Sequence, residues 1–301
     1  MIAVLGPGGV GGLLAALLQR SGTEVTVVAR EPTAELIAER GLSVESAAFG
    51  DFKARPPAVA EFHAAEADTL IVATKANGLA PALERVHGEP GLVVPLLNGI
   101  DHIAALRERY GTRAMAASIR VESTRPQPGV IVHTSSSVLV ELASADPAMH
   151  ERMAELVGAL RAAGIDAAIG RSEAEVMWSK LVRLNALALT TAASGRTIGE
   201  IRTGDRWRNE LHAAIDEAVA VAVAEGVAIE AADVRQELES AHATLSSSMA
   251  RDVAAGREPE LDAISGAVLR AGRRHGIACP TIEVLAAIVR RRIGEQPPSS
   301  R

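Results

Sequence analysis

The stretch MIAVLGPGGVG at residues 1–11 opens the chain and holds a Gly-x-Gly-x-x-Gly turn at the point where a strand must give way to a helix. In such a turn Gly6 makes the tight bend, Gly8 lets the backbone approach a pyrophosphate, and Gly11 lets helix and strand pack closely. The unpaired N–H groups and the positive dipole end of the following helix favour an anion. The pattern therefore predicts a dinucleotide-binding turn.

The residues around this turn complete a βαβ unit. Residues 2–5 are an apolar run of strand length, residues 13–18 are apolar and compatible with a helix, and residues 24–28 predict a second buried strand. A glycine-rich turn without a ligand is the structural alternative, and the glycine pattern alone does not exclude it. The strand–turn–helix context favours the dinucleotide.

The second predicted strand ends at Arg30, close to where an NAD-binding fold has an acid that contacts the ribose 2′-hydroxyl. A carboxylate there would repel a 2′-phosphate, whereas a guanidinium can bind one through two hydrogen bonds. Arg30 therefore favours NADP over NAD, although Glu31 follows it directly. The alternative is an exposed arginine at a strand end, because arginine is mostly a surface residue.

Length and composition limit the classes of protein. The 301 residues suffice for two domains, because single cores stop growing at about 250 to 300 residues. A net charge of −6 gives no electrostatic sign of a nucleic-acid or anionic-membrane partner. Cys279 is the only cysteine, so no intrachain disulfide can form and a cytoplasmic location is expected. Residues 1–19 lack a basic targeting region, and no apolar run is long enough for a membrane span.

The order of predicted elements indicates an α/β fold with two domains. Up to residue 170, helical stretches alternate with short apolar runs, which predict a largely parallel sheet with right-handed crossovers. These runs are residues 69–73, 92–97, 114–119, 130–133 and 138–142, and the last two could form an antiparallel pair. We expect a Rossmann-type dinucleotide-binding domain over residues 1–170.

Long helical periodicity begins at Glu173 and continues in residues 210–225 and 264–275. It predicts an all-α domain over residues 171–301, with Ser172 capping its first helix, helped by Glu175 three residues later. Residues 296–301 have the composition of a disordered tail.

Polar residues follow two of the predicted strands. Lys75 comes after residues 69–73 and Asn98-Gly99 comes after residues 92–97, so both lie at carboxyl ends of sheet strands, where open α/β sheets bind ligands. Lys75 could reach cofactor phosphate or ribose, and the Asn98 amide could bridge nicotinamide and substrate. The alternatives are a solvated lysine and a turn dipeptide, because Asn-Gly is common in turns.

The second predicted domain offers Lys180 beside a large apolar anchor, Trp178. A lysine in a partly dry cleft can have a lowered pKa and give a proton to the alkoxide that forms as hydride reaches a carbonyl. The alternative is a helical lysine that extends to water. Residues 246–249 (SSSM) and 258–262 (EPELD) add hydroxyls and an acidic turn, for which helix capping and a solvated loop are the alternatives.

Taken in order, these motifs make the chain resemble the ketopantoate reductase family, which reduces 2-dehydropantoate with NADPH in pantothenate biosynthesis. The resemblance covers nearly all 301 residues. It implies that Lys180 is the proton donor, that Glu260 is a second acid of the catalytic cleft, and that Ser248 binds the substrate carboxylate. It places Asn98 near cofactor and substrate, and it implies that the cofactor is bound by Gly6, Gly8, Gly9, Val10, Gly11, Arg30, Lys75 and Asn98.

The chain departs from the family pattern at four positions. Family members that reduce ketopantoate carry asparagines four and eight residues after the catalytic lysine, in an Asn-Gly-Glu segment, and three residues before the serine that matches Ser248. The corresponding residues here are apolar: Leu184, Ala188, Ile198 and Leu245. A site without these hydrogen-bond partners can reject a polar substrate by a ratio on the order of 10⁴. The reaction type is therefore a firmer prediction than the substrate.

Helical geometry indicates which neighbours of Lys180 could replace the missing amides. At about 100° per residue, Leu184 lies about 40° from Lys180, whereas Asn185 lies about 140° away, on nearly the opposite face. Arg183, at about −60°, is better placed, and we hypothesise that it contacts a substrate carboxylate. The alternative is a surface arginine.

The sequence thus predicts NADPH-dependent reduction of a small 2-oxo acid in an interdomain cleft, with Lys180 supplying the proton and Glu260 helping to hold the lysine and the substrate. No metal, nucleic acid or membrane partner is expected, and a homodimer through the helical domain is suggested by the family alone. A dehydrogenase of a more apolar hydroxy compound and an NADP(H)-binding sensor without turnover are the alternatives. The presence of Lys180, Asn98, Ser248 and Glu260 favours an enzyme, because a sensor needs no proton donor.

Overall fold

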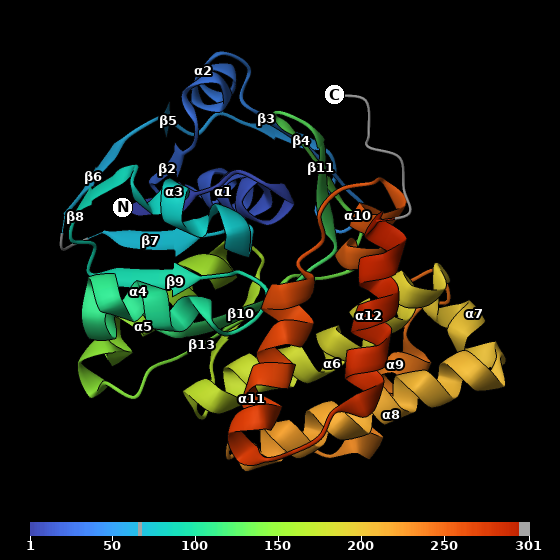
Figure 1. Ribbon diagram of the computed structural model, residues 1–301. Helices are drawn as coiled ribbons and strands as arrows, with labels where there is room; N and C mark the ends of the chain where they lie inside the picture. The colour runs from blue at the N-terminus through green and yellow to red at the C-terminus, as the bar shows by residue number, and fades with distance from the viewer. Residues whose placement is uncertain (66–67, 295–301) are drawn as a thin grey trace. The chain divides into compact units, whose positions relative to one another are not determined.

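The computed structural model describes residues 1–65 and 68–294 and divides them into two compact units (Figure 1). One, here called the sheet unit, holds Met1–Leu97 and His102–Val176. The other, the helical unit, holds Asn98–Asp101 together with the residues from Met177 onward. The boundary falls inside helix α6 (Glu173–Ser194), whereas the predicted junction follows residue 170. The predicted tail at 296–301 lies outside the described residues.

The sheet unit is built on five parallel strands in the order β5-β2-β1-β7-β9, which confirms the predicted α/β class. The strands read as apolar runs because a parallel sheet is covered on both faces. Their bounds are β1 (Ile2–Leu5), β2 (Val25–Val28), β5 (Ala58–Val59), β7 (Thr69–Val72) and β9 (Leu92–Pro95). The helices of this unit are α1 (Gly9–Arg20), α2 (Glu31–Arg40), α3 (Leu79–Leu83), α4 (His102–Tyr110) and α5 (His150–Ala162).

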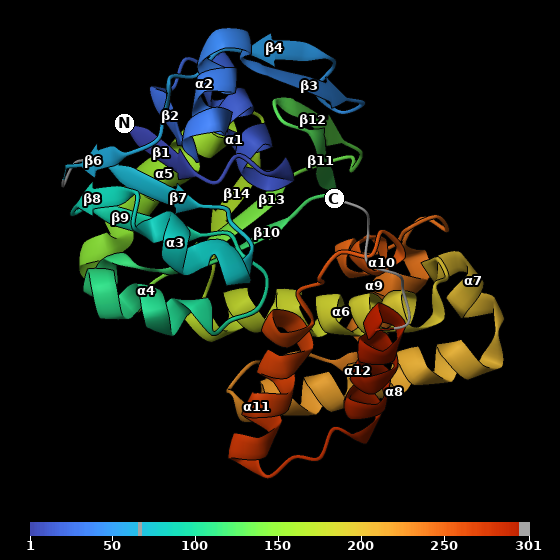
Figure 2. The same ribbon diagram turned by 45° about the horizontal axis from the view of Figure 1, so that its top comes forward.

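Three smaller sheets complete the sheet unit, and Figure 2 shows the strands of the largest together. That sheet has the order β11 (Ser123–Gln127), β12 (Val130–His133), β3 (Leu42–Ser46) and β4 (Phe52–Ala54). The second has the order β10 (Ala116–Arg120), β13 (Leu139–Ala143) and β14 (Asp166–Ile169). The third pairs β6 (Phe62–Ala64) with β8 (Val86–Gly88).

The suggested antiparallel pair of residues 130–133 with residues 138–142 was wrong. A tight turn at Gly129, whose φ is +78°, returns the chain from β11 to β12, so β11 takes one edge of β12. Strand β3 takes the other edge, in parallel. Both edges of β12 are therefore occupied, and β13 pairs with β10 and β14 instead.

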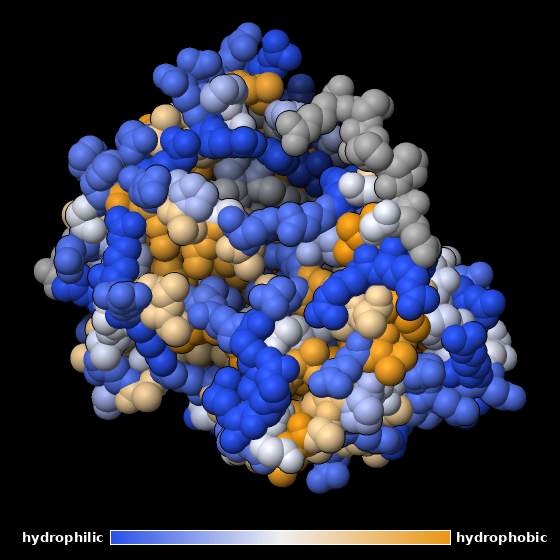
Figure 3. Space-filling view, in the orientation of Figure 1, coloured by the Kyte–Doolittle hydropathy of each residue, from blue (hydrophilic) through white to orange (hydrophobic). Residues whose placement is uncertain are grey.

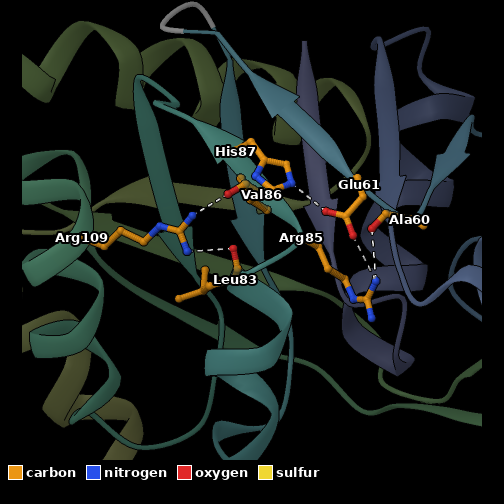
Figure 4. A network of polar contacts seen from close by, with 7 residues as sticks. All are labelled: Ala60, Glu61, Leu83, Arg85, Val86, His87 and Arg109. Carbon is orange, nitrogen blue, oxygen red and sulfur yellow. Dashed lines mark hydrogen bonds and ion pairs between the residues drawn. The ribbon is translucent and has the colours of Figure 1, made fainter.

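Polar side chains link α4, β8 and the segment that precedes β6 (Figure 4). Arg109 of α4 donates to the carbonyl oxygens of Leu83 at 2.8 Å and Val86 at 2.5 Å, which satisfies backbone groups where α3 ends and β8 begins. On the other side of β8, His87 Nε2 lies 2.8 Å from a carboxylate oxygen of Glu61. These contacts add to the apolar packing of Phe62, Val86 and Leu106, which belong to one buried cluster, and together they fix β6 and β8 beside α4.

Only helices occur in the described part of the helical unit, as predicted. Ser172 caps α6, accepting the Glu175 backbone N–H at 3.1 Å, while the Glu175 carboxylate binds Arg171 instead of completing a capping box. The predicted helices over residues 210–225 and 264–275 are present, although the second begins as a π-helical turn. The remaining elements are α7 (Ile198–Thr203), α8 (Asp205–Ala224), α9 (Ala231–Ser240), α10 (Ser248–Ala254), η4 (Asp262–Gly266, the π-helical turn), α11 (Ala267–His275) and α12 (Pro280–Gly294).

Charged side chains satisfy several helix ends in this unit. The Glu217 carboxylate of α8 accepts the backbone N–H groups of Thr281 at 2.8 Å and Ile282 at 2.9 Å, at the start of α12. Arg292 of α12 donates to the carbonyl oxygen of Ala192 at 2.6 Å, near the end of α6. A carboxylate at an N-terminus and a guanidinium at a C-terminus also match the helix dipole.

Hydrophilic residues cover most of the face shown in Figure 3. Large apolar side chains that are well exposed in the described ranges are Met1, Val223 and Val284. None of the described helices is long and apolar enough to cross a membrane.

Candidate active site

The glycine turn of the sheet unit is shaped by backbone packing. Gly6 has φ +92°, and a Cβ on it would lie 2.9 Å from Thr74 Cγ2, beyond the end of β7. A Cβ on Gly11 would collide with the carbonyl oxygen of Gly6, and one on Gly9 would collide with the backbone of Ser123. Close packing of turn, helix and strands therefore requires glycine at all three positions.

Gly8 differs from these glycines, because a Cβ there would have nothing within 4 Å. Gly8 is the N-cap of α1, no side chain caps that helix, and its first turn has no acidic residue. The helix N-terminus therefore offers backbone donors and the positive end of its dipole beside open space. These features fit the phosphates of a dinucleotide.

Arg30 and Lys75 flank this turn along the sheet. Strand β1 lies between β2 and β7, so the residues that follow these parallel strands share one edge. Arg30 is exposed and is the N-cap of α2, and Lys75 is exposed just before the 3₁₀ turn η1 (Ala76–Gly78). Val10 packs partly buried against the core. The edge thus presents a guanidinium on one side of the glycine turn and an ammonium on the other.

The helical unit brings together Lys180, Asn98 and Glu260. Lys180 Nζ donates to Asn98 Oδ1 at 3.1 Å, and Asn98 Nδ2 donates to Glu260 Oε2 at 2.9 Å. A carboxylate only accepts and an ammonium only donates, so this arrangement fixes which way the amide points. We call these three residues the Lys180 centre.

Each side chain of the Lys180 centre is held by its own element. Lys180 is on α6, two residues after Trp178, whose side chain is buried in the core. Asn98 precedes Gly99, which has φ +82° and packs so closely that a Cβ would collide with the Ala263 carbonyl oxygen of η4. Glu260 comes just before η4, and π-helical turns occur often at functional sites.

Ser248 and Arg183, the other two predicted substrate-binding residues, lie outside the Lys180 centre. Ser248 is exposed at the start of α10, where its neighbour Ser247 is the cap and accepts the Ala250 backbone N–H at 3.0 Å. Arg183 Nε lies 2.7 Å from a carboxylate oxygen of Glu237 on α9. The Arg183 charge is therefore already paired within the helical unit.

The four apolar replacements do not share one environment. Ala188 and Ile198 are 0% exposed and Leu245 is 5% exposed, so these three belong to the core. Leu184 is only partly buried. Leu184 is thus the replacement with surface available to a ligand.

One positioning candidate was not identified from the sequence. Arg270 binds Asp101 and Asp262, which follow Asn98 and Glu260 closely along the chain. A signal was present, because Asp262, Gly266 and Arg270 recur at four-residue spacing, which places them on one helical face.

Over residues 1–65 and 68–294, no group of three or more His, Cys, Asp or Glu could hold a metal ion.

Family comparison accounts for both units. The family model described as ketopantoate reductase PanE/ApbA matches residues 2–146, and the model of its C-terminal part matches residues 172–292. The chain belongs to the ketopantoate reductase family. It is therefore an oxidoreductase of that family, as its resemblance predicted.

Individual relatives agree with this placement. A 2-dehydropantoate 2-reductase of Halobacterium salinarum is 28% identical over 300 residues, covering 96% of this chain and 97% of the relative. The crystal structure of 2-dehydropantoate 2-reductase from Geobacter metallireducens has a TM-score of 0.87 at 28% identity, covering 97% of this chain and 99% of that one. A D-mandelate dehydrogenase solved with NADH and anilino(oxo)acetate shares the fold, with a TM-score of 0.86 at 21% identity over 97% of this chain and 98% of that one.

Proposed function

We propose that this chain catalyses the NADPH-dependent reduction of a 2-oxo acid to a 2-hydroxy acid. The observation that carries the proposal is the hydrogen-bonded chain from the Lys180 ammonium through the Asn98 amide to the Glu260 carboxylate. Protonation of a carbonyl oxygen requires a positioned proton donor, and this chain supplies one together with the groups that orient it. Membership of the ketopantoate reductase family supports the same reaction type.

In the proposed mechanism, NADPH when bound supplies the hydride that the carbonyl carbon accepts. Lys180 donates a proton from Nζ to the carbonyl oxygen, which becomes the product hydroxyl, and the neutral amine then regains a proton from solvent. Asn98 directs the ammonium by accepting one of its N–H groups at 3.1 Å. Glu260 holds the amide in that orientation through the 2.9 Å bond to Asn98 Nδ2.

The preference for NADPH is proposed from the edge that follows β1, β2 and β7. Arg30 would bind the 2′-phosphate and Lys75 a phosphate or ribose oxygen, while the N-terminus of α1 would bind the pyrophosphate. The mandelate dehydrogenase, in contrast, was solved with NADH. Replacing Arg30 by Ala should weaken NADPH binding about tenfold or more and leave NADH binding unchanged. Equal losses for both cofactors would contradict the role of Arg30.

We further propose that the substrate carries an apolar group beside its carbonyl. Leu184 follows Lys180 by one turn of α6, is partly exposed, and would contact such a group. The anilino(oxo)acetate in the mandelate dehydrogenase complex carries an anilino group, with its apolar ring, on the oxo carbon, which is consistent with this class. Ser248 is proposed to bind the substrate carboxylate, with Arg183 as a second candidate if its pair with Glu237 opens.

The deciding experiment measures NADPH oxidation with ketopantoate, pyruvate, a branched 2-oxo acid and phenylglyoxylate. We expect turnover of the branched or aryl acid, and a loss of about 10²- to 10⁴-fold in Lys180→Ala. Leu184→Asn should shift the preference towards ketopantoate, whereas Val223→Asn, at an exposed position on α8, should not. Turnover insensitive to Lys180→Ala would refute the mechanism. Unchanged Michaelis kinetics in Arg183→Ala would exclude that residue.

The same assay tests the alternatives. A sensor would bind NADPH and turn over no member of the panel, and a dehydrogenase would act faster on the 2-hydroxy acid with NADP⁺. A cytoplasmic location, which rests on the single cysteine, and a homodimer, which rests on family analogy, are further proposals. Light scattering on the purified chain would test the dimer.

A further inference from the structure

Arg270 of α11 binds both segments that bring partners to Lys180. Its Nη2 donates to Asp101 Oδ2 at 2.5 Å and to the Asp262 carbonyl oxygen at 3.0 Å. Its Nη1 donates to Asp262 Oδ1 at 2.8 Å. The hydrogen bond to Asp262 raises the pKa of Arg270, with Asp101 adding to the effect, so the guanidinium stays charged at every working pH. One side chain thus joins residues 161 positions apart (262 − 101).

The two bound segments carry the groups of the Lys180 centre. Asp101 follows Asn98 by three residues, and Asp262 follows Glu260 by two. Between them, Gly99 packs directly on the Ala263 carbonyl of η4, so the segments already touch through their backbones. The Arg270 contacts lie on the far end of each segment from the hydrogen bond between Asn98 and Glu260. Arg270 therefore limits how these segments can slide along each other.

The missing side chain of Gly266 leaves space for the ion pair between Arg270 and Asp262. A Cβ on Gly266 would collide with Asp262 Oδ1 and lie 2.9 Å from Arg270 Nη1. Both atoms are at the ends of flexible side chains, so an added methyl group would displace the ion pair rather than the helix backbone. Alanine also favours a helix more than glycine does.

The exposure of the ion pair indicates what it contributes. The side chains of Arg270, Asp101 and Asp262 are 35%, 49% and 86% exposed, and exposed ion pairs add little to folding stability. Their geometry has a different consequence, because small errors in the placement of a reacting group reduce its rate strongly. We propose that Arg270 is a positioning residue that clamps residues 98–101 to residues 260–262 and so holds Asn98 and Glu260 in register with Lys180. This inference rests on the proposed function of the Lys180 centre.

The test compares Arg270→Gln and Gly266→Ala with a matched control on the same helix, Arg274→Gln, which breaks the 2.9 Å pair between Arg274 and Glu225. We expect kcat to fall by about 10- to 100-fold in the first two variants, with NADPH affinity and melting temperature close to wild type. The control should keep its kcat. In an Asn98→Ala background, Arg270→Gln should add no further loss, because it acts through Asn98.

A second readout keeps the positioning role separate from the proposed reaction. The Asn98 side-chain NH₂ signal, assigned by NMR with Asn98→Asp, should shift in Arg270→Gln and Gly266→Ala and stay in place in Arg274→Gln. An unmoved signal, or a full additional loss in the Asn98→Ala background, overturns the clamp. Shifted signals in a protein that turns over no 2-oxo acid would keep the clamp and reject the proposed function instead.

Discussion

The glycine turn of the sheet unit and the Lys180 centre of the helical unit are built in opposite ways. The turn uses backbone atoms of consecutive residues and depends on side chains being absent at Gly6, Gly9 and Gly11. The Lys180 centre uses three side chains, and its hydrogen bonds join residues 82 and 162 positions apart. A side chain added at one of these glycines should therefore cost much unfolding free energy, whereas single side-chain substitutions in the helical unit should cost less.

The largest effect is expected for Gly11→Val in the sheet unit. Its Cβ would collide with the Gly6 carbonyl oxygen, a backbone atom that cannot move aside, so we expect a loss of about 3 kcal/mol or more in unfolding free energy. Denaturant unfolding measures it. The matched control is Gly8→Ala, which has open space and should change stability by less than about 0.5 kcal/mol while weakening NADPH binding. Similar unfolding midpoints for both variants would contradict the distinction.

A smaller effect is expected for Glu217→Gln in the helical unit. The neutral amide has one acceptor oxygen for two backbone N–H groups and loses the charge at the start of α12, so stability should fall by about 1 to 2 kcal/mol. Thermal unfolding would show it. Asp216→Asn is the control. It removes the exposed ion pair between Asp216, the residue before Glu217, and Arg235, and should lower stability by less than about 1 kcal/mol. The reverse order of the two losses would show that α12 does not need this cap.

His133 should give the sheet unit a pH dependence of its own. Its ring nitrogens lie 2.9 Å from Ser46 Oγ and 2.8 Å from Ser135 Oγ, and burial lowers its pKa against the opposing effects of the Ser137 carbonyl and Glu122. Below about pH 6.5 the unfolded chain then binds more protons than the folded one. The contribution of His133 to folding stability is therefore fully present above that pH and is lost as the pH drops.

Unfolding curves of the wild type and His133→Gln between pH 8 and pH 5 would measure this effect. The variant should be less stable at neutral pH and should lose less on acidification. Parallel curves for the two proteins would place the acid sensitivity elsewhere.

The last prediction concerns the reactivity of the Cys279 thiol, which reports on how well the helical unit buries it and requires no change in the structure. Burial, with smaller effects of Glu217 and Glu283, raises the pKa of the thiol to about 11. At pH 8 a disulfide reagent should label the native protein at least about a hundredfold more slowly than the unfolded chain, because only the thiolate reacts. Glu217→Gln should speed the labelling. Equal rates in native and unfolded protein would show that the thiol is not protected.

The fold could be predicted where one stretch of sequence contained a whole element. Strands β1 and β2 with α1 follow from local apolar runs and the glycine spacing, and the helices of the second half follow from periodicity. Strand β11 was missed because its sequence, STRPQ, is polar and includes a proline, which an edge strand tolerates. The pairing of β12 was wrong for the same reason, since its true neighbour had not been recognised.

The candidate site was predicted less completely. The motifs indicated Lys180 and Glu260. Of the Arg270 contacts, the one with Asp262 follows a four-residue spacing in the sequence, whereas the one with Asp101 joins residues 169 positions apart and has no such signal. The helical wheel of α6 also says little about exposure, because residues 185–193 are buried on every side. Ala188 shares a face with Lys180 and still belongs to the core, and only the structure distinguishes it from Leu184.

Asn185 offers a route to a more heat-resistant enzyme. It is 0% exposed on α6, and neither of its amide atoms has a hydrogen-bond partner. An unsatisfied buried polar group costs about 1 to 3 kcal/mol, and an apolar side chain of similar volume at this position would remove that cost. The residue is five positions from Lys180 and points away from it, so protein engineers could gain thermal tolerance here without touching the reacting groups.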